Sequence, residues 1–398
     1  MSLQVAKIKQ IPIKLHFSLI LIFLLIAWTL AYSFMPRYAP ELNQVQHWIM
    51  SIIGTVILFL SVLIHELSHS IVARSYGIRV KQIMLFIFGG VSDIEEEPKE
   101  FKKEFKMAMA GPAISLALSA IFGVFWWVIT VVAEPSSTPV SFSSANDSSA
   151  TALIMANGIF YYSSILNLIL GIFNLIPAFP MDGGRILRSL LFRRNKNYDK
   201  STRIAVRIGV IMSYVFFGFG ILTILSGAFV SGLWIILIGW FLQNGAQSYL
   251  YQYDVMNILS KIRLNDLMKT NIISVSEDIT INNVLRNYFN IYMKSSFPVT
   301  KINYEIIGTI SLKSCLNVPE QERDTTLVKN VMSPKNKIKL LNVNDTAEKA
   351  LSIMIKENQD KIFVCNDNDI IEGVVSKTDI IEAMDERKSF ITTRNKGV

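Results

Sequence analysis

The stretch Ile64-His65-Glu66-Leu67-Ser68-His69 lies inside a long apolar run and determines how the rest of the chain is interpreted. Residues four apart share one face of an α-helix, so His65 and His69 can reach a single metal ion. Glu66 lies beside them, where its carboxylate can act as a general base. Histidine is rare, 4 of 398 residues, and ionisable side chains in a membrane helix are costly without a partner. The stretch therefore predicts a metal site within a membrane helix.

Six apolar runs, including this one, are long enough to cross a bilayer. A spanning helix needs about 20 mainly apolar residues, because lipid offers the backbone no hydrogen bonds. Only 18% of the residues are charged, and the mean hydropathy is +0.39. The sequence therefore predicts a polytopic α-helical membrane protein with a soluble C-terminal part. The predicted spans are residues 17–35, 49–73, 107–132, 152–175, 204–226 and 230–250.

The basic residues alternate between the connections of these spans. They lie in the N-terminal segment and after the second and fourth spans, whereas the other connections hold only Arg37. The positive-inside rule then predicts that both termini are cytosolic. No cleavable signal peptide is apparent, so we expect a multi-pass protein of the cell membrane, of prokaryotic type. Topology also accounts for the net charge of +8, and no nucleic-acid partner is expected.

Two histidines leave a metal such as zinc short of a third protein ligand. The candidate is Asp182, which we expect to be the one acidic residue near a span end in the same leaflet. Pro177 and Pro180 break the fourth span just before it, and two glycines follow it. Zinc suits this chemistry because it lowers the pKa of a bound water to about 7 and polarises a carbonyl. The alternative is that Asp182 only caps the next helix.

With these motifs the chain resembles the site-2 protease family of intramembrane zinc metalloproteases, over roughly residues 8–195. The resemblance implies that His65, His69 and Asp182 bind one zinc ion and that Glu66 is the general base. It also implies that Asn174 contacts the substrate backbone or the developing oxyanion. The usual Asn-Pro-Asp-Gly string appears here as Phe179-Pro180-Met181-Asp182, so the local backbone path is expected to differ. Further matching segments are Ile11–His16, Gly89-Gly90-Val91, Ala110-Gly111-Pro112, Asn174–Pro177 and Asp182–Arg185.

Residues 83–91 are too short to cross a bilayer as a helix. Their aromatic and β-branched content and the Gly89-Gly90 pair predict a short membrane-associated strand or hairpin. Such backbone is tolerated at membrane depth only against protein or a wet cavity. Gly89, Gly90 and Val91 are therefore candidate substrate-binding residues at an edge that can receive an extended peptide by strand addition.

After Asp254 the long apolar runs end, and the sequence pattern predicts short strands and amphipathic helices. This change divides the chain into residues 1–253 and 254–398. Leu264–Met268 resembles Val328–Met332, and Gly308–Ser311 resembles Gly373–Ser376. The nearly constant offset between these pairs argues for two copies of one unit, at approximately 262–317 and 326–387. Two cysteines, Cys315 and Cys365, exclude a disulfide scaffold.

These repeats resemble a tandem of cystathionine β-synthase-type (CBS) domains, a soluble α/β fold. The resemblance implies that Ser376, Thr378 and Asp379 bind an adenine nucleotide (ATP, ADP or AMP), with Asp379 on the ribose hydroxyls. The first copy reads Ser311-Leu312-Lys313-Ser314 and lacks this aspartate, so at most one good site is expected. The alternative is a purely structural or dimerising pair. Because paired CBS units commonly associate, a homodimer through these domains is a further expectation.

Three functions remain open on the sequence. The first is a zinc-dependent intramembrane endopeptidase, modulated by a nucleotide, that cleaves single-pass membrane proteins or signal peptides within the lipid bilayer. The second is a CBS-regulated transporter or channel, in which the histidines line an ion path. The third is an inactive protease-like scaffold. Glu66 between the histidines and Asp182 at a broken span favour the first, and no internal repeat among the spans supports the second.

Overall fold

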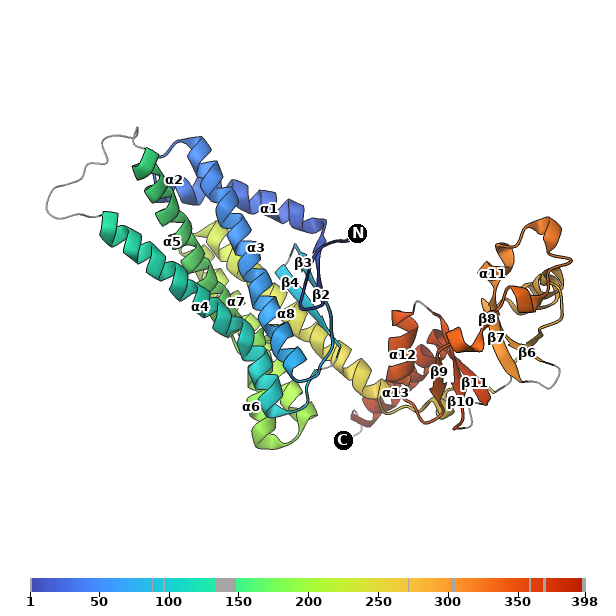
Figure 1. Cartoon of the computed structure of the whole chain (residues 1–398). Helices are drawn as coiled ribbons and strands as arrows, with labels where there is room; N and C mark the ends of the chain where they lie inside the picture. The colour runs from blue at the N-terminus through green and yellow to red at the C-terminus, as the bar shows by residue number, and fades with distance from the viewer. Residues whose placement is uncertain are drawn as a thin grey trace. The chain divides into compact units, whose positions relative to one another are not determined.

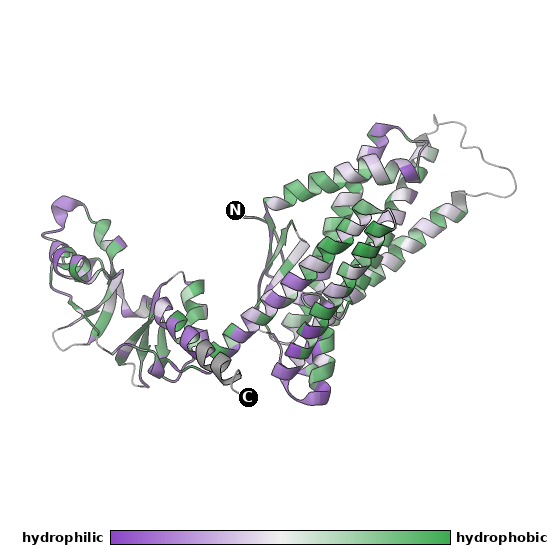
Figure 2. Ribbon diagram, turned by 180° about the vertical axis from the view of Figure 1, so that it is seen from behind, coloured by the Kyte–Doolittle hydropathy of each residue, from purple (hydrophilic) through white to green (hydrophobic). Residues whose placement is uncertain are grey.

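The computed structural model describes residues 2–87, 89–95, 97–133, 148–270, 272–301, 305–357, 359–367 and 370–395 (Figure 1). Contacts divide the chain into two compact units, Met1–Leu250 and Tyr251–Val398. Six described helices are long and apolar enough to cross a membrane, as the sequence predicted. Figure 2 shows apolar residues along these helices, whereas the second unit mixes apolar and polar residues as a soluble domain does.

The six spans are helices with defined ends. The first is interrupted by a π-helical turn, and the second begins at Asn43, whose side chain and that of Gln46 form a reciprocal capping box. The third contains Pro112, and a further short helix, α6, follows the fourth. The helices are α1 (Ser18–Thr29), the π-turn Leu30–Phe34, α2 (Met35–Tyr38), α3 (Gln44–Ser75), α4 (Phe101–Ala133), α5 (Ser148–Asn174), α6 (Asp182–Asn195), α7 (Tyr198–Leu225) and α8 (Phe229–Leu259).

A four-stranded sheet accompanies the helices, where the sequence predicted only a strand or hairpin. Its strands are β1 (Ser2–Ile8), β2 (Ile11–His16), β3 (Val80–Phe86) and β4 (Gly89–Ile94), in the order β1-β2-β3-β4. The sequence did not predict that an N-terminal hairpin joins this sheet, because the parallel pairing of β2 with β3 connects segments about 70 residues apart. Among the described strands, β4 is paired only with β3 and has a free edge, and residues 83–86 belong to an inner strand.

The chain between α5 and α6 is not helical, as the two prolines predicted. A Cβ added to Gly183 would lie 2.1 Å from the carbonyl oxygen of Ile176, and one added to Gly184 would lie 2.7 Å from the amide nitrogen of Phe179. The two glycines therefore let the start of α6 fold back onto the broken segment. This packing fixes the position of Asp182, the first residue of α6.

The second unit consists of two similar halves. In each, two antiparallel strands precede a helix that begins at a serine cap, Ser311 in the first half and Ser376 in the second. Each half also lends a segment to the other: Lys269 pairs with Val374 on β11, and Ser333 pairs with Thr309 on β7. Both cysteines are buried thiols. The main elements are β5 (Val275–Ser276), α9 (Ile281–Val284), α10 (Asn290–Tyr292), β6 (Ser296–Thr300), β7 (Ile306–Ser311), α11 (Leu312–Leu316), β8 (Ser333–Pro334), β9 (Leu340–Asn342), α12 (Ala347–Lys356), β10 (Lys361–Cys365), β11 (Ile371–Ser376) and α13 (Lys377–Asn395).

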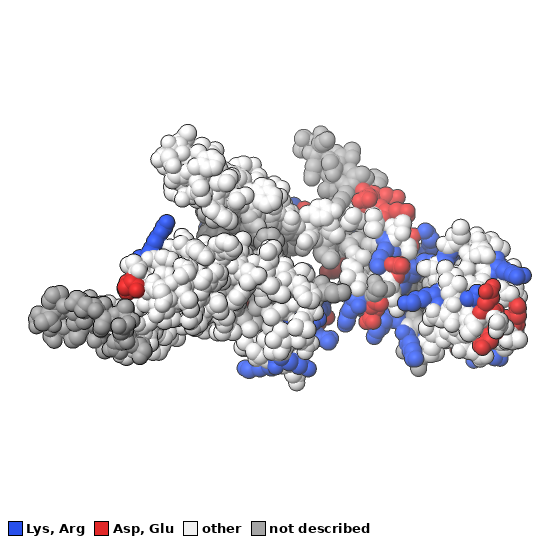
Figure 3. Space-filling model, turned by 90° about the horizontal axis from the view of Figure 1, so that it is seen from above, with Lys and Arg blue, Asp and Glu red and all other residues white. Residues whose placement is uncertain are grey.

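Charged residues are unevenly distributed over the molecule. Figure 3 shows few of them on the long helices and many of both signs on the second unit. An apolar surface of this extent suits lipid rather than water.

Helices α7 and α8 pack closely through two glycines. A Cβ added to Gly232 would lie 2.6 Å from the carbonyl oxygen of Gly220, so only glycine permits this approach. Small residues at such contacts are typical of membrane helix pairs, where close van der Waals packing replaces the hydrophobic effect.

We expect Gly232→Ile to lower the melting temperature of the detergent-solubilised protein. Overpacking costs about 1–3 kcal/mol, which corresponds to a shift of at least about 2 °C for a unit of this size. The matched control is Gly218→Ala on α7, because a Cβ there would meet no atom within 4 Å. Equal melting temperatures for the two variants would contradict the close packing of α7 on α8.

Candidate metal centre

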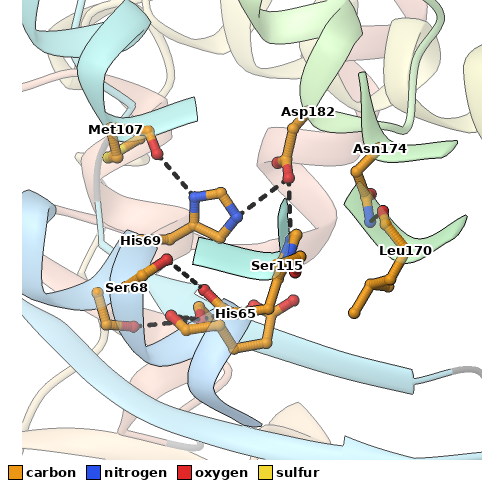
Figure 4. A network of polar contacts seen from close by, with 11 residues as sticks. His65, Ser68, His69, Met107, Ser115, Leu170, Asn174 and Asp182 are labelled. Atoms are coloured by element: carbon orange, nitrogen blue, oxygen red, sulfur yellow. Dashed lines mark hydrogen bonds and ion pairs between the residues drawn. The ribbon is translucent and has the colours of Figure 1, made fainter. Parts of the chain in front are cut away.

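Three side chains from two separate segments converge on one point inside the helical unit. The Nε2 atoms of His65 and His69 lie 3.1 Å and 3.0 Å from the same carboxylate oxygen, Oδ2 of Asp182 (Figure 4). Both histidines are buried, and the Asp182 side chain is 14% exposed. Among the described residues, this is the group of histidine, cysteine and acidic side chains whose geometry can hold a metal ion.

The second nitrogen of each imidazole is also engaged. His69 Nδ1 lies 2.7 Å from the carbonyl oxygen of Met107, and His65 Nδ1 lies 2.9 Å from the hydroxyl of Ser115. A carbonyl can only accept, so His69 Nδ1 must donate, and in a neutral ring Nε2 then carries a lone pair. That lone pair faces the Asp182 carboxylate, so a cation or a proton must lie between these two acceptors.

The backbone of α4 lies directly against this centre at Gly111. A Cβ added there would lie 2.2 Å from His69 Nε2 and 2.4 Å from His65 Nε2. Any residue other than glycine would fill the space next to the converging nitrogen atoms. The arrangement therefore fits a metal: two imidazole nitrogens, one carboxylate oxygen, a neighbouring space kept open by glycine, and an outer hydrogen bond on each ring, as zinc sites require.

Burial raises the pKa of the Asp182 carboxyl group, but imidazoles that carry a proton on the facing nitrogen and donate to it lower that pKa below its usual range. The prediction that Asp182 only caps the next helix is not supported by its contacts, because it lies within the helix and its oxygen faces the histidines.

Glu66 is oriented by the sheet. The hydroxyl of Ser92 on β4 donates to Glu66 Oε2 over 2.8 Å and also contacts the Glu66 carbonyl oxygen. A Cβ added to Gly90 would lie 2.5 Å from Glu66 Cγ, so β4 passes directly over this side chain. The free-edged strand and the candidate base are thus in contact, which the sequence alone could not show because nothing marked Ser92 as a partner.

The remaining predicted residues of this unit have less defined roles. Asn174 is the last residue of α5, and its amide donates to the Leu170 carbonyl of its own helix over 2.9 Å (Figure 4). Val91 on β4 is 48% exposed, which leaves its side of the strand accessible.

The sequence argument for the third ligand overlooked one acidic residue. Glu104 lies in the first turn of α4, also at a span end, and is fully buried. Its Oε1 accepts from Nε of Arg188 over 2.6 Å, so it already has a cationic partner. Charge pairing, which spacing does not reveal, distinguishes Glu104 from Asp182.

In the second unit, the Asp379 carboxylate has two kinds of partner. Its Oδ2 accepts from the amide and hydroxyl of Ser376 over 2.8 Å and 2.6 Å, which forms a capping box at the start of α13. Its Oδ1 lies 2.6 Å from Nζ of Lys269. Burial raises the pKa of Asp379, but these donors together hold it below its usual range. Thr378 is exposed.

Comparison with known proteins agrees with both halves of this description. The family model "Peptidase family M50" matches residues 53–216, and the CBS domain model matches residues 264–320 and 328–386. A zinc metalloprotease of Methanocaldococcus jannaschii is 31% identical over 383 residues, which cover 96% of each chain. The Rip3 protein of Mycobacterium tuberculosis is 27% identical over 384 residues, 96% of this chain and 93% of that one. A solved site-2 protease from M. jannaschii is 34% identical, covers 62% of this chain and 94% of its own, and has a TM-score of 0.40.

The match along nearly the whole length of a zinc metalloprotease decides between the functions left open by the sequence. Neither a transporter nor an inactive scaffold is supported, and the predicted fold, a helical membrane part followed by CBS domains, is confirmed. The chain belongs to peptidase family M50, the site-2 proteases, and is a multi-pass, zinc-dependent peptidase with two CBS domains.

Proposed function

We propose that this peptidase is an intramembrane endopeptidase that cleaves within transmembrane segments of single-pass proteins or signal peptides. His65, His69 and Asp182 would hold one zinc ion per chain, and Glu66 would be the general base. The observation that carries the proposal is the pair of acceptors, His69 Nε2 and Asp182 Oδ2, facing each other 3.0 Å apart in a buried site. A divalent cation bound between them satisfies both.

The residues of the chain divide the chemistry between them. When bound, zinc would polarise the peptide carbonyl and lower the pKa of a water to about 7. Glu66 takes a proton from the attacking water and passes it to the leaving amine. Ser92 holds the Glu66 carboxylate in one orientation, and the Met107 carbonyl and Ser115 hydroxyl hold the two rings. Asn174 is a candidate donor to the substrate, after exchange of its bond to Leu170.

The substrate class follows from the position of the site. A membrane helix hides its carbonyl groups in i→i−4 hydrogen bonds, so the substrate must unwind before attack. An unwound segment can add to the free edge of β4 at Gly89, Gly90 and Val91 and bond through its backbone. Because β4 contacts Glu66 through Gly90 and Ser92, strand addition would bring the peptide next to the base.

We also infer the orientation in the membrane. The Lys and Arg residues before α1, between α3 and α4, and between α5 and α7 all belong to connections on one side of an even number of spans. Both termini and the CBS unit are then cytosolic in the cell membrane, and the centre lies toward that leaflet.

The direct test of this function compares two variants of the purified full chain. Asp182→Ala is expected to lose zinc and cleavage together, because two imidazoles alone bind zinc poorly. Glu66→Gln is expected to keep its zinc and to cleave at least about 100-fold more slowly, because a general base typically contributes this factor.

Elemental analysis measures the zinc content of each variant, and cleavage of a single-span substrate, with and without a chelator, measures the activity. The control is Asp199→Ala. Asp199 lies in the first turn of α7, and its partly exposed side chain pairs with Arg203. Normal zinc content in Asp182→Ala would show that another residue is the third ligand.

Removal of the Ser92 hydroxyl tests how the base is oriented. We expect Ser92→Ala to slow cleavage by roughly tenfold with zinc content unchanged, because Glu66 loses the donor that fixes its carboxylate. Ser92→Thr keeps a hydroxyl and should retain most of the activity. An alanine variant that cleaves at the wild-type rate would leave Ser92 without this role.

We further propose that the CBS unit binds one adenine nucleotide and that this binding modulates the peptidase. Lysines gather near the Asp379 carboxylate: Lys269 pairs with it, and Lys361 lies close by. Burial lowers the pKa of Lys361, and the neighbouring ammonium groups of Lys294 and Lys269 also lower it. Phosphates would relieve this repulsion, and Lys269, whose side chain is 69% exposed, can leave Asp379 to the ribose hydroxyls. Ser333 and Ser314 take the equivalent positions in the first half, so no second charged site is expected there. A homodimer of the chain would form through the same CBS unit.

Asp379→Asn is the appropriate variant for testing this site, because alanine would also remove the capping box of α13. We expect calorimetric titration of the full chain with ATP and AMP to show binding by the wild type and at least about tenfold weaker binding by the variant, since the ribose loses a charged acceptor. Asp385→Asn, an exposed residue of the same helix, is the control. No heat with either nucleotide would remove the proposed regulation.

A further inference from the structure

The largest fully buried side chain in the described structure is an arginine close to the candidate centre. Arg188 lies on α6, six residues after Asp182, and its side chain is 0% exposed. A buried guanidinium is costly unless its donors are satisfied and its charge is balanced. The partners of Arg188 therefore indicate which parts of the structure this buried charge holds together.

Each part of the guanidinium reaches a different element of the helical unit. Nε donates to Glu104 on α4 over 2.6 Å, Nη2 donates to Glu97 over 2.8 Å, and Nη1 donates to the hydroxyl of Tyr249 on α8. The Arg188 Cζ atom also lies 5.2 Å from the ring centre of Phe179, which itself stacks on Tyr249 at 4.1 Å. Arg188 thus joins four segments: the chain after β4, the start of α4, the segment before α6, and α8.

Three of these segments carry groups of the candidate centre. Glu104 precedes Met107 by one helical turn, and the Met107 carbonyl accepts from His69. Glu97 follows the end of β4, the strand whose Ser92 holds Glu66. Phe179 is in the non-helical segment that leads into Asp182 at the start of α6.

A second ion pair strengthens the connection to β4. Arg185, also on α6, lies 2.9 Å from the other oxygen of Glu97, and Tyr249 donates to Glu97 over 2.8 Å. Burial raises the pKa of Glu97, but the two arginines and the tyrosine lower it to about 2, so the carboxylate is charged at neutral pH. Both oxygens of Glu97 are engaged by α6, which fixes the segment after β4 to the helix that carries Asp182.

We propose that Arg188 is a positioning residue of the metal centre, whose guanidinium holds Asp182, the Met107 carbonyl and the end of β4 in one arrangement. It touches neither the proposed ligands nor the substrate strand and acts through Phe179, Glu104 and Glu97. The proposal rests on the proposed function of Asp182 and Glu66. It predicts that loosening this network weakens metal binding and slows catalysis.

Three conservative variants of the full chain test the proposal. Arg188→Lys keeps the charge but loses the planar fork, Glu97→Gln keeps the shape but loses the charge, and Tyr249→Phe keeps the ring and loses the hydroxyl. The matched control is Arg194→Lys, an exposed arginine on the same helix. The two gentler variants keep the test valid if Arg188→Lys fails to fold.

The readouts separate positioning from stability. Outer groups of metal sites typically change affinity or activity by 10–100-fold, so we expect about tenfold weaker zinc binding in chelator competition for Arg188→Lys. We also expect altered visible bands of the cobalt-substituted protein, which report the geometry of the metal ligands, and a lower kcat. Arg194→Lys should match the wild type in each measurement.

Two other outcomes would be informative. Folded variants with a lower melting temperature but wild-type metal affinity, cobalt bands and kcat would overturn the proposal and make the network purely structural. Normal zinc binding by Asp182→Ala would instead contradict the proposed function. That variant therefore tests the function independently of the Arg188 network.

Discussion

Two imidazoles and a carboxylate can share the interior of an apolar helical unit only if a positive charge lies between them. His65 and His69 direct Nε2 at one oxygen of Asp182, and the Met107 carbonyl prevents His69 from supplying that charge as a neutral ring. A metal ion meets this requirement, and much of the nearby structure follows from it. The α5 helix ends before Asp182, two glycines let α6 fold back, and a third glycine keeps the α4 backbone against the rings.

The strand β4 connects the proposed base to the proposed substrate-binding edge. A carboxylate such as Glu66 is useful as a base only if its orientation is fixed, and the group that fixes it, Ser92, belongs to the strand with a free edge. The segment after that strand is held by Glu97 to α6, the helix of Asp182. The elements that carry the proposed metal ligands, the proposed base and the proposed substrate edge thus lie against one another.

The long apolar runs, the helical spacing of the histidines and the proline-broken span were sufficient to predict the spans and the convergent residues, because each is a local signal. The repeat offset predicted two copies of one unit, and the resemblance identified them as CBS domains. The structure adds that each half lends a segment to the other, at Lys269 and Ser333. The N-terminal hairpin, Ser92 and the Arg188 network could not be predicted, since each depends on pairing between distant segments. Glu104 shows the same limit, because it lies near a span end in the sequence but its pairing with Arg188 is visible only in the structure.

The central claim is that a zinc ion is held by two imidazoles and one carboxylate in the helical unit. X-ray absorption at the zinc edge of the purified full chain measures this ligand set directly. The account predicts one zinc per chain, with two imidazole nitrogens at about 2.0–2.1 Å and oxygen ligands at about 2.0–2.2 Å. A spectrum with sulfur ligands, or with fewer than two imidazoles, would contradict it.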